Sequence, residues 1–221
     1  MKTIAVTITA AAIFIVSARG QAFQNLDFES ANNLPVNPPL NGTEVAAANA
    51  LPDWTAYSGP AIAINALSTI NYVSNELSGF RTSVELEGGS LALSGEFSAE
   101  LYLNSALGQT GLVPANAGSL QFEAEGPGGG GSLGGTGFSV ALGGQTLSYS
   151  AVSTGPGYTV YAANIPAAMD ALTETLTFSC QGAGSGEVAL DDINFVSVPE
   201  PSEWALMAVG AFTLVAYRRR K

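Results

Sequence analysis

Carboxylates are the side chains of this chain that could do chemistry, because most other residue types that act in catalysis or metal binding are scarce or missing. The 221 residues include 18 Asp and Glu, seven Lys and Arg, and no His. Without histidine the chain lacks the commonest general base and the commonest transition-metal ligand. Its one cysteine, Cys180, lies in an alternating apolar run, which predicts a buried structural thiol rather than a reactive one.

Two adjacent acids lie in the last apolar run of the chain, around residues 188–196. The apolar residues of this run fall on opposite parities, Val188 and Leu190 on one and Ile193 and Phe195 on the other. If all four face the core, one extra residue has to be accommodated at Asp191 and Asp192, and a β-bulge does this. A bulge changes the direction of the side chains next to it. We therefore predict a cation site at the two adjacent carboxylates.

Other acids come in pairs two residues apart, as at Glu85 and Glu87 and at Glu123 and Glu125. This spacing puts both members of a pair on one side of a strand, and we expect these sides to be solvated. A glycoside hydrolase needs only two carboxylates roughly 5–10 Å apart, so hydrolysis stays open. A serine nucleophile has neither a His nor a nearby Lys to activate it. We therefore expect that the protein is not an enzyme.

The N-terminus predicts export. Met1-Lys2-Thr3 is weakly basic, the stretch from Ile4 to Ala18 is uncharged and apolar, and small residues follow. This three-part layout is that of a secretory signal peptide. Residues 1–22 are therefore predicted to be removed, with cleavage after Ala22 preferred and cleavage after Gly20 as the alternative.

The C-terminus, residues 198–221, combines a polar motif, an apolar stretch and a basic end. Val198-Pro199-Glu200-Pro201-Ser202 precedes an uncharged stretch from Trp204 to Tyr217, and Arg218, Arg219, Arg220 and Lys221 follow it. An apolar run with a basic end predicts a membrane helix whose basic end stays in the cytoplasm. At about 1.5 Å per residue this helix would be roughly 21 Å long, against a bilayer core of about 30 Å, which favours a transient anchor.

These three C-terminal features closely resemble the PEP-CTERM sorting signal of proteins exported by Gram-negative bacteria. The resemblance implies recognition by an exosortase-type membrane protease. It also implies an inner-membrane intermediate, followed by a place at the cell surface or outside the cell.

Between the two ends, residues 23–197 form the body of the protein. It holds 16 acidic residues and one basic residue, Arg81, so its formal charge is 1 − 16 = −15. Such a body repels phosphate backbones, which excludes nucleic acid as a partner. Its length suits one domain with a core of its own.

Apolar and polar residues alternate through most of the body from residue 61 onward, with Gly-rich turns between the runs. This pattern predicts eight or more antiparallel strands in one all-β domain, a sandwich of the jelly-roll type. The Pro-rich residues 30–53 predict a surface excursion, and Ile165 to Thr173 predicts one turn of helix. The Gly-rich residues 126–137 predict a flexible hairpin loop, because a nucleotide-binding glycine motif would need a helix after it.

The opening Asn25-x-x-Phe28-Glu29, then Trp54, and the closing Leu190-Asp191-Asp192-Ile193 resemble the galactose-binding-like jelly roll. Several families of carbohydrate-binding modules share that architecture. In those relatives the first and last strands meet and hold a structural calcium ion. The resemblance implies Glu29 and Asp192 as calcium ligands here, with Asp191 as the alternate and backbone carbonyls completing the shell. The alternative is that these acids are solvated edge residues.

Two aromatic residues are candidates for stacking on a sugar. Tyr102 lies on the polar parity of its run, beside Glu100 and Asn104. Trp54 is the only tryptophan of the body, and it is predicted first as a core anchor and second as a sugar platform.

Together these features predict an exported, exosortase-sorted protein with a structural or adhesive role in the envelope or the biofilm. The first alternative is a carbohydrate-binding module for exopolysaccharide. The second is a glycan-active hydrolase.

Overall fold

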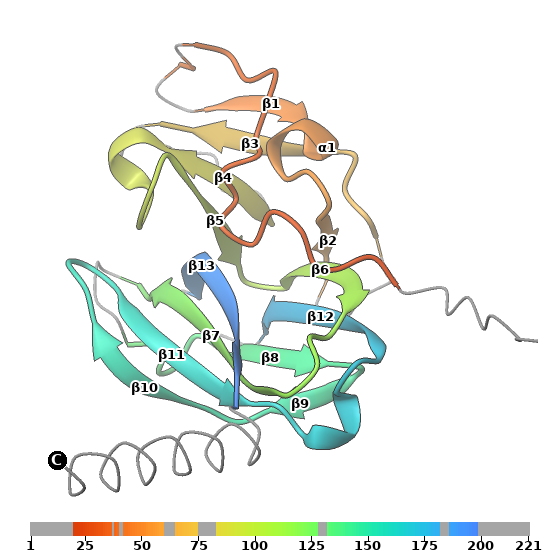
Figure 1. The fold of residues 1–221 in the computed structure, drawn as a ribbon. Coiled ribbons are helices and arrows are strands. Elements are labelled where there is room, and N and C mark those ends of the chain that lie inside the picture. The colour runs from red at the N-terminus through yellow and green to blue at the C-terminus, as the bar shows by residue number, and fades with distance from the viewer. Residues whose placement is uncertain are drawn as a thin grey trace, which may run out of the picture.

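The chain is almost entirely β-strand in the computed structural model, which describes residues 20–36, 38–39, 42–59, 65–74, 83–127, 132–181 and 186–198 (Figure 1). Most of the predicted signal peptide and everything after Val198, including the rest of the sorting motif and the basic cluster, lie outside the described residues. Within those ranges, no helix has the length and apolar character needed to cross a bilayer.

The strands form two sheets. The larger sheet has eight strands in this order: β1 (Thr43–Ala46), β3 (Thr69–Val73), β4 (Val84–Gly88), β5 (Phe97–Tyr102), β13 (Glu187–Ser197), β7 (Ala117–Glu125), β11 (Thr159–Asn164), β10 (Tyr149–Thr154). The smaller sheet has five, in this order: β2 (Thr55–Ser58), β6 (Ser105–Leu112), β12 (Thr173–Cys180), β8 (Phe138–Leu142), β9 (Gln145–Leu147). All neighbours are antiparallel except β3 and β4, which are parallel. The predicted all-β sandwich of the jelly-roll type is confirmed.

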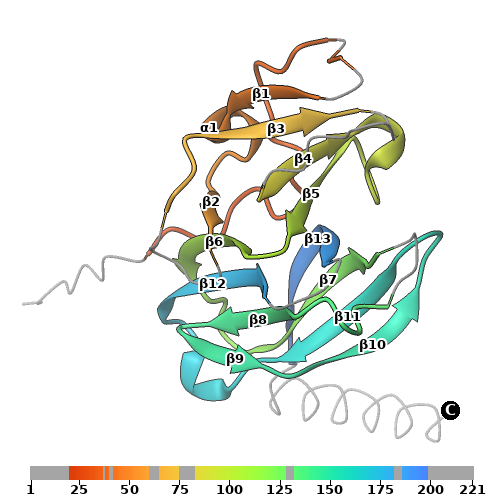
Figure 2. The ribbon, with the colours of Figure 1, turned by 180° about the vertical axis from the view of Figure 1, so that it is seen from behind.

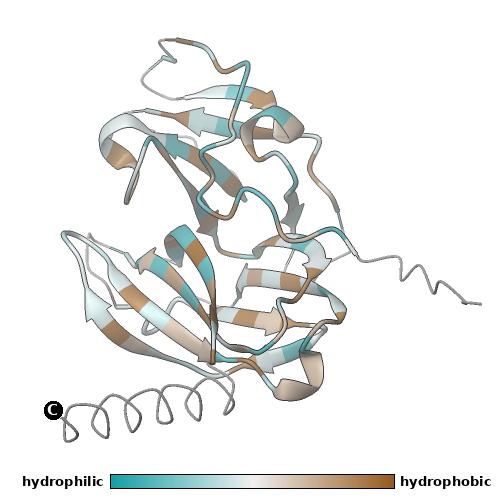
Figure 3. Ribbon diagram, in the orientation of Figure 1, coloured by the Kyte–Doolittle hydropathy of each residue, from teal (hydrophilic) through white to brown (hydrophobic). Residues whose placement is uncertain are grey.

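The two sheets stack face to face over one core. Figure 2 shows both sheets from behind, and Figure 3 shows apolar and polar residues alternating along the strands. On β7, Leu120, Phe122 and Ala124 are fully buried. Phe122 lies 5.5 Å from the ring of Phe178 on the opposite sheet. Burying rings of this size supplies most of the free energy that holds two sheets together.

Trp54 belongs to this core, as its first interpretation predicts. Its side chain is 5 % exposed and packs between the rings of Phe28 and Phe178, at centroid distances of 5.6 and 6.3 Å. The indole Nε1–H donates to the backbone carbonyl of Asn25 at 2.8 Å, so its one polar group is paired. The second interpretation, a sugar platform at the surface, does not fit Trp54, because only 5 % of its side chain is exposed.

The prediction for Cys180 is also confirmed. The thiol forms no disulfide and is fully buried, and this burial raises its pKa to about 12. A thiol of that kind stays protonated and unreactive.

Strand β13 contains the predicted bulge. Its pairing with β7 shifts register between Asp191 and Asn194. Val188 and Leu190 before the bulge and Ile193 after it are all buried. Asp192 absorbs the extra residue with φ = 42°, in the left-handed region that Asp adopts more readily than most residues.

Two further local predictions have different outcomes. The helical turn is present as the 3-10 helix η2 (Ala167–Met169), directly after Pro166. The segment 30–53 is not a pure surface excursion, because it contains β1 and the short helix α1 (Ala47–Ala50), whose Ala50 is buried. Tertiary pairing of β1 with β3 decides this, and proline content could not reveal it.

The Gly-rich segment after β7 does not close a hairpin, and that prediction was wrong. β7 pairs with β13 and β11 in the larger sheet, whereas β8 pairs with β12 and β9 in the smaller one. The two strands that flank the Gly-rich residues therefore lie in different sheets, and residues 128–131 themselves lie outside the described residues. A third short helix, η1 (Gly89–Leu91), lies in the connection from β4 to β5.

Candidate functional site

Seven carboxyl groups project from the outer side of the eight-stranded sheet, on four neighbouring strands. We call this group the acidic face; its members are Glu85 and Glu87 on β4, Glu100 on β5, Glu187 and Asp191 on β13, and Glu123 and Glu125 on β7. Their strand neighbours, such as Leu86, Leu101 and Leu190, are fully buried in the core. Because side chains alternate along a strand, the acids must point to the opposite side.

Register places several of these acids opposite one another on neighbouring strands. Glu85 pairs with Glu100, and Ala189 of β13 pairs with both Glu100 and Glu125. Asp191 of β13 also pairs with Glu123. Like charges directly opposite each other on neighbouring strands destabilise a sheet. Such an arrangement is therefore costly to the fold.

The acidic face is more buried than the sequence predicts. Glu85 is 1 % exposed and Glu123 is 8 % exposed, so the expectation of solvated pairs is wrong for these two. The connection from β4 to β5 folds over this side of the sheet, where Ser94 donates from its backbone N to Asp191 Oδ2 at 3.1 Å. Alternation tells which side of a sheet a residue faces, but not whether another segment covers that side.

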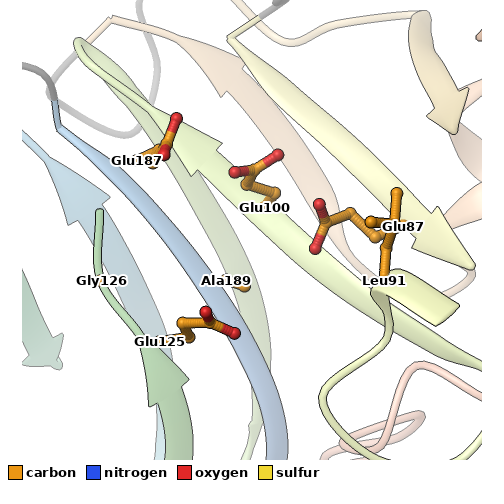
Figure 4. A pocket seen from close by; sticks show the side chains of 7 residues that line it. All are labelled: Glu87, Leu91, Glu100, Glu125, Gly126, Glu187 and Ala189. Atoms are coloured by element: carbon orange, nitrogen blue, oxygen red, sulfur yellow. The ribbon is translucent and has the colours of Figure 1, made fainter. Parts of the chain in front are cut away.

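A small hollow opens in the middle of the acidic face. It measures about 140 Å³ and is lined by Glu87, Leu91, Glu100, Glu125, Gly126, Glu187 and Ala189. Figure 4 shows the four carboxyl groups arranged around Ala189. The space exists because Ala189, which sits between Glu100 and Glu125, has only a methyl group where its neighbours have long side chains.

The pKa values of two acids that line the hollow, Glu87 and Glu125, are raised. Burial, and then the charge of the Glu100 carboxylate, raises the pKa of Glu87 to about 9, so Glu87 is neutral at pH 7. Burial and the charge of Glu100 also raise the pKa of Glu125. One wall of the hollow therefore carries a protonated carboxyl at neutral pH, which is hydrogen-bonded to Glu100.

Tyr102, a predicted sugar-binding residue, does lie on the acidic face. Its hydroxyl is hydrogen-bonded to the Glu100 carboxylate, and it lies 3.5 Å from Oε2 of Glu85. The side chain is half-buried. These contacts make Tyr102 a side chain that positions Glu100, at the edge of the hollow.

The predicted calcium ligands lie where the first and last segments of the body meet, as the jelly-roll resemblance implies. Ile193 donates from its backbone N to the carbonyl of Leu26 at 2.9 Å. Glu29 Oε1 accepts from the backbone N of Glu96 at 2.7 Å and of Phe97 at 3.1 Å. A side chain at Gly95 would collide with the Glu29 carboxylate, so only glycine allows this approach.

Asp191 is likewise held by hydrogen-bond donors. Its Oδ2 accepts from both the backbone N and the hydroxyl of Ser94, and its Oδ1 accepts from the backbone N of Asp192 at 2.7 Å. Burial nonetheless raises the pKa of Asp191 to about 7. Donors at both oxygens take the positions that a cation would need.

Across the part of the chain that the structure describes, no three Asp, Glu, Cys or His side chains gather in a way that could hold a metal ion. Glu29 and Asp191 instead tie the chain ends to residues 94–97 by hydrogen bonds. Calcium binding at Glu29, Asp191 and Asp192 stays a prediction.

Sequence reasoning did not identify the hollow. The alternation pattern shows that each of the acids Glu87, Glu100 and Glu125 lies on the polar side of its own strand. It does not show that β13 inserts between β5 and β7, because β13 comes about 60 residues or more later in the chain. Local alternation carries no information about such pairing.

Comparison with known proteins adds little to this geometry. No protein-family model matches the chain, and no curated protein matches it. Among solved structures, the chain is similar to the carbohydrate-binding module TmCBM61, solved in complex with beta-1,4-galactotriose. The similarity covers 80 % of this chain and 99 % of that chain, at 14 % identity and a TM-score of 0.37. At these values the similarity gives no information about the site.

Proposed function

We propose that the chain is an exported carbohydrate-binding protein whose hollow on the acidic face holds one sugar residue. The observation that carries this proposal is the hollow itself, in which four carboxyl groups from four strand segments surround a space floored by Ala189. Its volume of about 140 Å³ is similar to the roughly 150 Å³ of an apolar cavity that admits benzene, so the hollow has room for a ligand group of about that size.

The chemistry of the lining suits a sugar. Sugar hydroxyls donate hydrogen bonds, and ionised carboxylates are acceptors with two oxygens each. The carboxyl of Glu87 is hydrogen-bonded to Glu100, which fixes the positions of both groups in the lining. Leu91 and Ala189 offer apolar contact to the C–H side of a ring. A few placed polar groups among apolar atoms are typical of small-ligand sites.

Export and sorting complete the proposal. The signal peptide at residues 1–22 and the PEP-CTERM-like tail at residues 198–221 support delivery to the cell surface by an exosortase-type protease. At that location, binding to exopolysaccharide would give the protein its adhesive role in the envelope or biofilm.

The proposal is tested by filling the hollow. The full chain in mild detergent is titrated calorimetrically with a panel of oligosaccharides, neutral, amino and acidic, that includes β-1,4-galactotriose. Ala189→Trp should weaken binding of any ligand at least about tenfold, because the indole occupies the space. The matched control is Ala162→Trp, on the same side of the sheet at β11 and outside the hollow, which should bind like the wild type. Equal affinities of the two variants would overturn the proposal.

A second candidate function is glycoside hydrolysis, which one observation favours. Neutral Glu87 could protonate a leaving oxygen while Glu125, across Ala189, acts as the base or nucleophile. Release of reducing ends from a bound oligosaccharide, abolished in Glu87→Gln, would replace binding by hydrolysis as the function. Intact oligosaccharide after prolonged incubation would rule hydrolysis out.

A further inference from the structure

We propose that the signal peptide is cut after Gly20, so that the mature protein begins at Gln21 and keeps Ala22. This inference rests on the export that the proposed function includes, and it places the processing site. Small residues three positions and one position before a cut permit cleavage after Gly20, through Ala18 and Gly20, and also after Ala22, through Gly20 and Ala22. The contacts of residues 21–24, which we call the N-terminal clamp, distinguish the two cuts.

The first two residues of the clamp pair with strand β6 of the smaller sheet. The backbone carbonyl of Gln21 accepts a hydrogen bond from the backbone N of Leu112 at 2.7 Å, and Ala22 forms a parallel β-bridge with the same residue. Strand β2 pairs with β6 only from Ser105 to Gly108, so Leu112 lies beyond its end. The clamp therefore pairs with a part of the β6 edge that β2 does not cover.

The next two residues of the clamp contact both sheets. Phe23 is 8 % exposed, and its ring stacks on Phe195 of β13, in the larger sheet, at a centroid distance of 5.0 Å. The ring also lies so close to Gly111 of β6 that a side chain there would collide with it. Gln24 donates from its backbone N to Oε1 of Gln109 at 2.7 Å, and its carbonyl accepts from Nε2 of Gln109 at 2.8 Å. The clamp thus joins β6 to β13.

Cleavage after Ala22 would weaken the clamp in two ways. It would remove the Gln21 carbonyl, so the backbone N–H of Leu112 would lose this acceptor. It would also place a protonated α-amine on Phe23, a residue that the fold buries, and burial of a charge is unfavourable. Cleavage after Gly20 instead puts the amine on Gln21, which is exposed to solvent. The fold therefore favours a mature chain that starts at Gln21.

The first test identifies the N-terminal peptide of the full chain, expressed in its host, by mass spectrometry. The wild type should begin at Gln21. Ala18→Phe places a bulky residue three positions before the proposed cut and leaves Gly20 and Ala22 unchanged, so it should accumulate the uncut precursor. The matched control Ala22→Phe places the same bulky residue directly before the other cut, and it should mature at Gln21 like the wild type.

The outcomes separate this inference from the proposed function. A mature chain that begins at Phe23, or at any residue other than Gln21, overturns the inference while export stands. Maturation that is blocked by Ala22→Phe and not by Ala18→Phe overturns it in the same way. A wild-type chain that keeps Met1 overturns both the inference and the export on which it rests.

A stability measurement tests the clamp itself. Deleting Gln21 and Ala22 from the full chain places Phe23 directly after Gly20, so that the proposed cut makes Phe23 the first residue. The deletion should lower the melting temperature by about 2–4 °C, because the hydrogen bond to Leu112 is lost. The matched control Gln21→Ala keeps the backbone carbonyl and should melt like the wild type. Equal melting temperatures for the deletion and the control would overturn the role of the clamp, and with it the reason for a cut after Gly20.

Discussion

Glu87 keeps its proton at neutral pH because the fold buries it beside Glu100. Its pKa of about 9 in the folded state lies far above the ordinary value near 4, so the folded state binds more protons than the unfolded state between these pH values. Stability from such a group is fully present below about pH 4 and is lost as the pH rises through the folded pKa. Asp191, with a pKa of about 7, acts in the same direction over a narrower range.

At the residue scale, we therefore predict that the free energy of unfolding falls from pH 5 to pH 9. The loss should be on the order of 1 kcal/mol or more, measured by denaturant unfolding at several pH values. The side chain in Glu87→Gln cannot ionise, so this variant should show a flatter dependence of the free energy of unfolding on pH. Its stability relative to the wild type should be highest at pH 9. The control Glu174→Gln should keep the wild-type slope. A Glu87→Gln profile parallel to that of the wild type would contradict the prediction.

The bulge in β13 links the core to the acidic face. By absorbing one residue at Asp192, it keeps Leu190 and Ile193 in the core while Asp191 points into the acidic face. Without the bulge, one of these two apolar residues would move to the outer side, because side chains alternate with period two.

At the element scale, Asp192→Gly is predicted to leave stability unchanged or to raise it by up to about 1 kcal/mol, because glycine adopts the left-handed backbone freely. Asp192→Val should lower stability by about 1–3 kcal/mol, because a β-branched side chain is strained there. The control is Asn194→Val, an exposed position in the regular part of the same strand, where valine is favourable. Thermal unfolding of the three variants measures these changes in stability. If valine lowers stability no more at position 192 than at position 194, the bulge does not need a residue that adopts the left-handed backbone, and the prediction is wrong.

At the scale of the whole molecule, the strands of the body end before the predicted C-terminal sorting signal. β13 ends at Ser197, and Val198 is 60 % exposed, with its backbone N donating to the carbonyl of Asn116 at 2.8 Å. All thirteen strands of the described residues lie before the predicted sorting motif. Removal of the tail should therefore leave the sandwich folded.

We predict that deleting residues 198–221 changes the destination of the protein in its host while sugar binding is kept. Fractionation of cells and medium, followed by immunoblotting, measures the change. The matched variant replaces Pro199-Glu200-Pro201 by three alanines and keeps the apolar stretch and the basic end. A truncated protein that still reaches and stays at the wild-type destination would refute the sorting signal.

Much of the fold could be predicted from local sequence because alternation with period two sets the buried side of each strand. The core position of Trp54, the buried thiol of Cys180 and the bulge at Asp191 and Asp192 all follow from such local patterns. The segment 30–53 and the Gly-rich connection were mispredicted because their environment depends on partners far along the chain.

The sequence by itself determined a histidine-free, strongly acidic all-β body and the parity of each glutamate on its strand. Only the tertiary structure decided that β13 lies between β5 and β7, which places Glu100 and Glu125 on either side of Ala189. It also decided that the connection after β4 covers part of this side and buries the acids. Strand order and coverage arise from contacts between distant segments, and pKa values follow from that burial, so local spacing could not reveal the hollow.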